Sequence, residues 1–229
     1  MARGNSQNSL LQFLDFVQEP LRTQVYNRRT EIRRPRGRTL IEEGIPSTDV
    51  FFLREGEAEV RLYSTRWREI VYLHTLGPGD IFGEISALDG KSRSASVEAL
   101  SKLVVADVLR ASDFLACLES SPAASIWLAR RMASGFRRLT DKVFELSALN
   151  VSARIHCELL RLADKGEKPN GRIIVDPAPN HQELADRVGT NREAVTREMG
   201  YLSKQKIIEY KRRKLVIIDL AALEKAIQR

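Results

Sequence analysis

The sequence has few of the residues that build metal centres or covalent cross-links. Its 229 residues include only two cysteines, Cys117 and Cys157, and three histidines. Two cysteines cannot supply the four thiolate ligands of an iron–sulfur cluster, and we interpret both as core thiols. The histidines (His74, His156 and His181) show no metal-ligand spacing, so we predict no metal site.

The chain also lacks a long hydrophobic run. Charge interrupts the apolar stretch at residues 10–17, which therefore predicts an amphipathic first helix and not a signal peptide or membrane span. We expect a cytoplasmic protein with no membrane partner. The formal net charge of +7 divides into +5 for residues 149–229 and +2 for the remainder. This basic excess is compatible with a nucleic-acid partner for the C-terminal part but does not decide the function.

The first half of the chain has the pattern of a small β unit. Residues 37–44 and 50–62 alternate apolar and charged side chains between glycines, which is typical of strands. Residues 77–80, Gly-Pro-Gly-Asp, form a turn cluster. Short strands separated by such turns predict a closed antiparallel unit with its ligand pocket inside.

Residues 82–95 follow that turn and combine charged, hydroxyl and glycine residues (FGEISALDGKSRSA). Arg93 and the backbone amides of a short turn can hold a phosphate. Glu84 can accept a hydrogen bond from a ribose hydroxyl. The segment therefore predicts a cyclic phosphodiester ligand, with a partly buried Glu84–Arg93 ion pair between strands as the structural alternative.

This segment resembles the phosphate-binding cassette of cyclic-nucleotide-binding domains, F-G-E-[LI]-[SA]…R-[ST]-A, found in the cyclic AMP receptor protein (CRP/FNR) family of bacterial transcription regulators. The resemblance assigns Glu84 to the 2′-hydroxyl and Gly83 to a close approach of backbone to sugar. It assigns Arg93 and Ser94 to the cyclic phosphate. The predicted ligand site comprises Gly83, Glu84, Ile85, Ser86, Arg93, Ser94, Ala95, Leu139 and Thr140.

A heptad pattern follows Pro122. Apolar residues recur at spacings of four and three, at Met132, Phe136, Leu139, Val143 and Leu146. A helix packed on its own domain is one interpretation; the resemblance implies a dimerisation helix, with a hinge at Asn150.

The resemblance also places Leu139 and Thr140 where the enteric receptor protein has two adjacent hydroxyl residues near the adenine amino group. Only Thr140 retains a hydroxyl. Because one such hydrogen bond contributes about 0.5–1.5 kcal/mol, we expect cAMP as effector and leave cGMP open. A haem-sensing or iron–sulfur relative is disfavoured by the intact cassette and the two cysteines.

The last third of the chain has the pattern of a winged helix-turn-helix. Residues 182–188 predict one helix, 189–191 a turn, and Val195, Met199 and Leu202 the buried face of a second helix N-capped by Asn191. Residues 207–210 and 215–218 predict a hairpin with the basic tip 211–214. The predicted DNA contacts are His181, Asn191, Arg192, Glu193, Thr196, Arg197, Lys211 and Arg213.

The second helix resembles the R-E-x-V-x-R recognition helix of the same family, which implies reading of a TGTGA-type half-site. Arginine to guanine and glutamate to cytosine are the pairings that geometry favours. The structural alternatives are an i,i+4 pair between Glu193 and Arg197 on a solvated face, and a solvated turn at residues 211–214.

We therefore predict an α+β protein with an N-terminal cyclic-nucleotide-binding β-roll (1–120), a long dimerisation helix (121–149) and a C-terminal winged helix-turn-helix (150–229). The expected function is a cyclic-nucleotide-responsive homodimeric regulator that binds double-stranded palindromic DNA and RNA polymerase. A ligand-independent regulator with a vestigial pocket is the alternative. An enzyme such as a phosphodiesterase is disfavoured because no metal cluster or nucleophile and base accompany the cassette.

Overall fold

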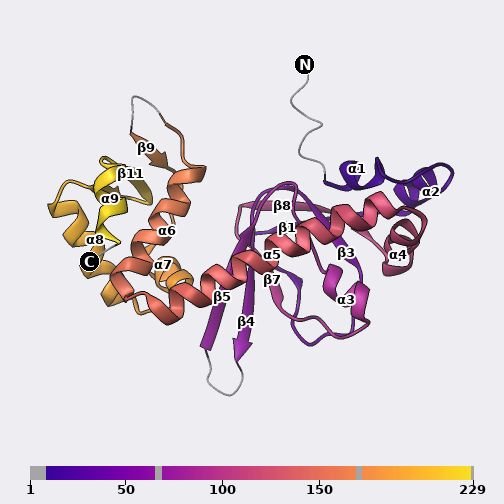
Figure 1. Ribbon diagram of the computed structural model, residues 1–229, viewed down its shortest axis with the longest axis horizontal. Helices are drawn as coiled ribbons and strands as arrows, with labels where there is room; N and C mark the ends of the chain where they lie inside the picture. The colour runs from indigo at the N-terminus through magenta and orange to yellow at the C-terminus, as the bar shows by residue number, and fades with distance from the viewer. Residues whose placement is uncertain (1–8, 65–68, 169–171, 228–229) are drawn as a thin grey trace. The chain divides into compact units, whose positions relative to one another are not determined.

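A computed structural model describes residues 9–64, 69–168 and 172–227. The chain forms two compact units that divide between Arg137 and Arg138, inside the long helix α5 (Pro122–Ala148; Figure 1). The helix predicted as a separate module is therefore shared: its first part belongs to the first unit and its last turns to the second. Within the described ranges, no helix is long and apolar enough to cross a membrane.

The first unit contains two four-stranded antiparallel sheets. One has the order β1 (Thr30–Pro35), β8 (Leu103–Leu109), β3 (Val50–Glu55) and β6 (Ile81–Phe82). The other has the order β2 (Thr39–Ile41), β7 (Ser96–Ala99), β4 (Ala58–Ser64) and β5 (Glu69–Leu76). Apolar residues from both sheets form one buried cluster, in which the Phe51 and Phe82 rings stack 5.0 Å apart. This is the expected β unit.

The predicted strand at residues 50–62 is interrupted. It divides at Gly56 into β3 and β4, because this glycine has a φ of +79° and a Cβ there would lie 2.2 Å from the Leu103 carbonyl oxygen. Only glycine tolerates both conditions. Apolar residues lie on both sides of the turn, at 50–53 and again from Ala58 onwards, so residue type alone does not mark the break.

Helices cover the other side of the first sheet. These are α1 (Ser9–Leu14), α2 (Leu21–Arg28), α3 (Glu84–Asp89), α4 (Ala111–Ser120) and the start of α5. Phe13 of α1 packs against both Phe52 and Phe114, with ring centroids 5.7 and 5.2 Å away. Ala124 and Leu128 of α5 are buried in the same cluster, so the first turns of α5 are fixed to this unit.

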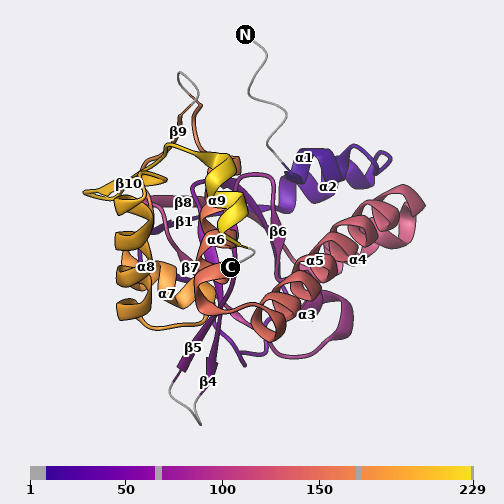
Figure 2. The ribbon, with the colours of Figure 1, turned by 60° about the vertical axis from the view of Figure 1, so that its left-hand side comes forward.

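The second unit is built around α6 (Val151–Lys165), against which α7 (His181–Val188), α8 (Arg192–Lys204) and α9 (Leu220–Ala226) pack (Figure 2). A three-stranded sheet has the order β10 (Ile208–Lys211), β11 (Lys214–Ile217) and β9 (Ile173–Val175). One apolar cluster joins the helices to this sheet. The predicted helix-turn-helix and hairpin are thus present.

The tip of the hairpin is shorter than predicted. Lys211 and Lys214 are paired strand residues, and the turn consists only of Arg212 and Arg213, with φ values of 50° and 61°. Two left-handed residues in succession suit the right-handed twist of a tight hairpin. The four basic residues therefore do not form one loop.

Candidate ligand and DNA-binding sites

The cassette begins at a left-handed glycine between β6 and α3. Gly83 has a φ of +82°, and a Cβ there would lie 2.7 Å from an Arg93 nitrogen and 2.8 Å from the Asp49 carbonyl oxygen. Any larger residue would displace the arginine. The resemblance assigned Gly83 to a close approach of backbone to ligand; in this structure the close approach is to Arg93.

Arg93 is buried, with 4% of its surface exposed. Its side chain donates to Ser47 Oγ (2.8 Å), the Gly83 carbonyl oxygen (2.8 Å) and the Asp49 carbonyl oxygen (2.7 Å). All three acceptors are uncharged groups. Because a buried charge is costly unless it is paired, this guanidinium is suited to an anionic ligand.

The loop between β2 and β3 holds Arg93 in place. In addition to the side-chain contacts, the Arg93 amide donates to the Ile45 carbonyl oxygen (3.0 Å) and the Gly44 amide donates to the Arg93 carbonyl oxygen (2.9 Å). Sequence reasoning missed Ser47 and Asp49, which lie 46 and 44 residues before the arginine. A lone serine in a loop gives no motif from which this contact could be found.

Glu84 is the first residue of α3 and is partly buried. Burial raises the pKa of its carboxyl above the ordinary value, while the nearby Arg93 and Arg131 act in the opposite direction. Among the ion pairs of the described residues, none joins Glu84 to Arg93, so the structural alternative for the cassette is not formed. The carboxylate is available as an acceptor.

The remaining cassette residues have different surroundings. Ser86 is buried and its hydroxyl lies 3.4 Å from the Ser92 carbonyl oxygen, so it belongs to the local fold. Ile85 and Ser94 are exposed, and Ala95 packs against the core between the sheets. Leu139 and Thr140 are exposed residues of α5 that belong to the second unit, whereas the cassette lies in the first.

The helix-turn-helix is built by its caps. The Asn180 side chain accepts from two amides at the start of α7 and Glu183 reaches back to the Asn180 amide. Gly189 ends α7 with a φ of +67°, and Asn191 caps α8 by accepting from the Ala194 amide (2.8 Å). The predicted cap is present, so the side-chain carbonyl group of Asn191 is used within the unit.

Helix α8 buries one face and exposes the other, as the sequence indicates. Val195, Met199 and Leu202 are buried, and the polar residues of the opposite face are exposed, namely Asn191, Arg192, Glu193, Thr196 and Arg197. The ion pairs found within the described ranges do not include the i,i+4 pair of Glu193 with Arg197. Both side chains therefore remain open to a partner.

His181 joins the two helices. Its Nδ1 lies 2.9 Å from the Thr196 hydroxyl, and its ring lies 5.1 Å from that of Tyr210. Burial, with a smaller contribution from the charge of Arg192, lowers the pKa of this imidazole. His181 and Thr196 thus contact each other, which sequence reasoning did not anticipate when it assigned both to DNA.

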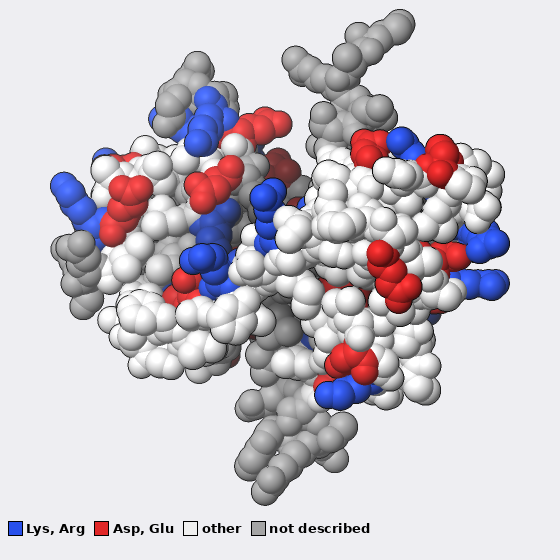
Figure 3. Space-filling view, turned by 45° about the vertical axis from the view of Figure 1, so that its right-hand side comes forward, with Lys and Arg blue, Asp and Glu red and all other residues white. Residues whose placement is uncertain are grey.

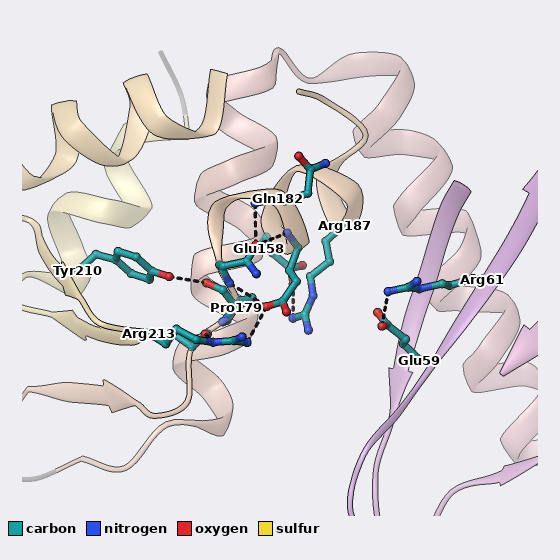
Figure 4. A network of polar contacts seen from close by, with 11 residues as sticks. Glu59, Arg61, Glu158, Pro179, Gln182, Arg187, Tyr210 and Arg213 are labelled. Atoms are coloured by element: carbon teal, nitrogen blue, oxygen red, sulfur yellow. Dashed lines mark hydrogen bonds and ion pairs between the residues drawn. The ribbon is translucent and has the colours of Figure 1, made fainter. Parts of the chain in front are cut away.

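Arg213 has internal contacts that the sequence did not indicate. Its guanidinium forms an ion pair with Glu183 (2.7 Å) and donates to the Ala178 carbonyl oxygen (3.1 Å; Figure 4). The Tyr210 hydroxyl donates to the neighbouring Pro179 carbonyl oxygen (2.9 Å). These contacts attach the hairpin to the start of α7, whereas Lys211 and Arg212 are exposed. The phosphate contact of Arg213 stays a prediction.

The surface charge is mixed and the cysteines are unpaired. On the face drawn in Figure 3, Lys and Arg are interspersed with Asp and Glu on a largely uncharged surface.

In the part of the chain that the structure describes, no group of three or more His, Cys, Asp or Glu side chains could hold a metal ion. Both cysteines are free thiols, and burial raises the pKa of Cys117 to about 11.

Two family models match the sequence. The cyclic nucleotide-binding domain matches residues 31–121 and the Crp-like helix-turn-helix domain matches residues 153–226. Each match contains one of the two sites: the cassette lies in the first, and α7, α8 and the hairpin lie in the second.

Curated relatives match most of the chain. The transcriptional regulator LdrP of Thermus thermophilus is 31% identical over 83% of this chain and 93% of its own length. A CRP-like cAMP-activated global transcriptional regulator of Mycobacterium tuberculosis is 26% identical over 81% of this chain and 82% of its own. A crystal structure of a CRP-family transcriptional regulator, also from Thermus thermophilus, superposes with a TM-score of 0.72 at 28% identity, covering 86% of this chain and 97% of that one. These matches, with the cassette and the helix-turn-helix in the expected domains, show that this chain belongs to the CRP/FNR family of transcription regulators.

Proposed function

We propose that the protein is a homodimeric regulator, acting in the cytoplasm, whose binding to palindromic TGTGA-type DNA is controlled by cAMP or cGMP. The observation that carries the proposal is the buried guanidinium of Arg93, which has only neutral acceptors. The Asp49 and Glu84 carboxylates act on this guanidinium without a direct contact among the described residues, and a cyclic phosphate would supply a directly bound counter-charge. The exposed Ser94 hydroxyl then donates to the phosphate, and Glu84 accepts from the ribose 2′-hydroxyl.

The choice of base rests on α5. The family resemblance places residues 139 and 140 near the base, and of these only Thr140 carries a hydroxyl. We therefore expect the free energy that separates cAMP from cGMP to be smaller than with two hydroxyls by about 0.5–1.5 kcal/mol. The cAMP-activated relative supports cAMP, whereas the name of LdrP specifies no effector. We propose cAMP as the main ligand and cGMP as the second candidate.

Dimerisation is proposed from the apolar row on α5. Met132, Leu139 and Val143 are 43%, 47% and 62% exposed, an arrangement that a helix of a monomer seldom shows. A second copy of the same helix can bury this row at heptad spacing. Two recognition helices then address half-sites about one turn of DNA apart, and RNA polymerase is the expected protein partner.

The alternative is a ligand-independent regulator with a vestigial pocket. Calorimetric titration of the ligand-free protein with cAMP and cGMP, followed by DNA binding with each nucleotide, separates the two. We expect nucleotide binding and a rise in DNA affinity. An affinity for DNA that is the same with and without either nucleotide would favour the alternative. Hydrolysis of the nucleotide would indicate an enzyme.

Replacing Arg93 with lysine tests the cassette. Lysine keeps the charge but cannot contact Ser47, Gly83, Asp49 and the phosphate at once, so Arg93→Lys should lower affinity for either nucleotide at least tenfold, since a hydrogen bond to a charged group contributes about 1.5–3 kcal/mol. Calorimetry on the folded variant measures this. Arg61→Lys, which alters the Arg61–Glu59 ion pair of β4, is the matched control. Full affinity in folded Arg93→Lys protein would contradict the assignment.

Replacing Glu84 with glutamine separates stability from binding. Because the folded-state pKa of Glu84 is raised, the folded protein binds this proton more tightly than the unfolded chain, and stability falls as pH rises from the unfolded to the folded pKa. At pH 7 the free energy of unfolding of the ligand-free Glu84→Gln protein should therefore equal or exceed that of the wild type. This difference in the free energy of unfolding should disappear below about pH 4.

Nucleotide affinity of Glu84→Gln should instead fall about five- to tenfold, because a neutral acceptor replaces a charged one. Denaturant unfolding at several pH values and calorimetry measure the two effects. A variant that is less stable at pH 7 and binds nucleotide normally would give Glu84 a structural role.

A charge in the apolar row tests the dimer. Val143→Glu should weaken self-association at least tenfold, because two copies of the carboxylate would be buried facing each other. Sedimentation equilibrium measures the dissociation constant. Leu103→Glu, at an exposed leucine of β8, controls for the added charge, and equal dissociation constants for the two variants would place the interface elsewhere.

DNA reading is tested by separating base contacts from phosphate contacts. Glu193→Ala should lose about 1–3 kcal/mol of discrimination at one base pair of each half-site, with non-specific affinity and salt slope nearly unchanged. Lys211→Ala should weaken binding to all sequences and flatten the salt dependence. Titrations on a palindromic site and single-base variants at two salt concentrations measure both. If Glu193→Ala lowers the affinity for every DNA variant equally, α8 is not the helix that contacts the bases.

A further inference from the structure

One carboxylate attaches the recognition helix to α6 at two points. Glu198 Oε1 lies 2.7 Å from His156 Nε2, and Glu198 Oε2 accepts from the Ser152 hydroxyl at 2.8 Å. The His156 and Glu198 side chains are 3% and 15% exposed. We call Ser152, His156 and Glu198 the α6–α8 clamp.

The acceptor in this contact settles which ring nitrogen carries a proton. With Glu198 as a carboxylate, which only accepts, the hydrogen in this contact is on His156 Nε2. The other nitrogen, Nδ1, is buried and has no hydrogen-bond partner among the described residues. A buried polar atom without a partner lowers the free energy of unfolding. If stability alone decided the residue, an apolar side chain would be favoured at position 156, so the bond to Glu198 points to a role other than stability.

The clamp defines an orientation that the core does not. Val195, Met199 and Leu202 attach α8 through apolar contacts, which are non-directional and tolerate small rotations. Ser152 and His156 lie one turn apart on α6, so each of them can bind one oxygen of the Glu198 carboxylate. This arrangement restricts both rotation of α8 about its axis and sliding along α6.

We propose that Glu198, His156 and Ser152 are positioning residues that set the angle at which α8 presents Arg192, Glu193 and Arg197 to the bases. The inference rests on the proposed function of α8 as the reader. Hydrogen bonds to base edges require correct distance and direction, whereas phosphate contacts through flexible lysines tolerate a rotated helix. Loss of the clamp therefore reduces specificity more than non-specific affinity.

The test measures the ratio of affinity for the palindromic site to affinity for a scrambled duplex, with full-length protein and saturating nucleotide. Glu198→Asp keeps the charge but is one methylene shorter, so it cannot reach both donors; we expect the ratio to fall at least tenfold. Ser152→Ala, which removes one donor from a half-buried position, should lower it two- to fivefold. Ser152→Thr, which retains a hydroxyl, should restore it.

Two controls separate positioning from stability and from the proposed function itself. Leu223 is a buried residue of α9 that lies outside the clamp. Leu223→Val should lower the stability of the same unit and leave the affinity ratio unchanged. Glu193→Ala removes a reader and should lower it. If Glu193→Ala lowers the ratio but folded Glu198→Asp and Ser152→Ala proteins do not, the clamp is only structural and the inference is overturned. If Glu193→Ala also leaves the ratio unchanged, the proposed role of α8 has failed instead.

Discussion

The first unit depends on one buried guanidinium. Arg93 is held by a loop serine, by two carbonyl oxygens and through its own backbone. Its position excludes a side chain at Gly83 and brings residues more than forty positions apart in sequence to one point. A charge can remain in such a place only when neighbouring dipoles partly replace water. The sheets, the loop between β2 and β3 and the start of α3 together provide those dipoles, and the cassette follows from that arrangement.

The second unit depends in a similar way on α6. Glu158 of α6 forms a buried ion pair with Arg187 of α7 at 3.2 Å and a second pair with Arg161 at 2.7 Å; the Glu158–Arg187 region appears in Figure 4. Arg161 also pairs with Glu145, in the last turns of α5. Arg154 donates to the Leu146 and Gly189 carbonyl oxygens at 3.4 and 3.1 Å. The end of α5, the turn of the helix-turn-helix and α8 are therefore all attached to one helix.

The sequence predicts those features that depend on local patterns. The polar face of α8 and the Asn191 cap follow from spacing and residue type, because helix periodicity and capping are local properties. Three features were not predictable in this way. Gly56 divides one segment into two strands at its close approach to Leu103. The contacts of Arg213 with Glu183 and of Ser47 with Arg93 form only in the tertiary fold. Each depends on a contact between distant segments, which a single sequence does not specify.

The same groups link stability to the proposed control of DNA binding. Arg93 is buried and Glu84 is partly buried. No ion pair of the described residues joins them, and burial disfavours the charged form of each. A ligand that compensates Arg93 stabilises the arrangement only when the loop, Gly83 and α3 are in place, and so it favours the folded, ordered state. A ligand shifts an equilibrium only by the difference in its affinity for the two states. In the proposed control of DNA binding, the charges of Arg93 and Glu84 therefore lower the stability of the unit before an effector binds. Their compensation by the effector contributes to the difference in its affinity for the two states.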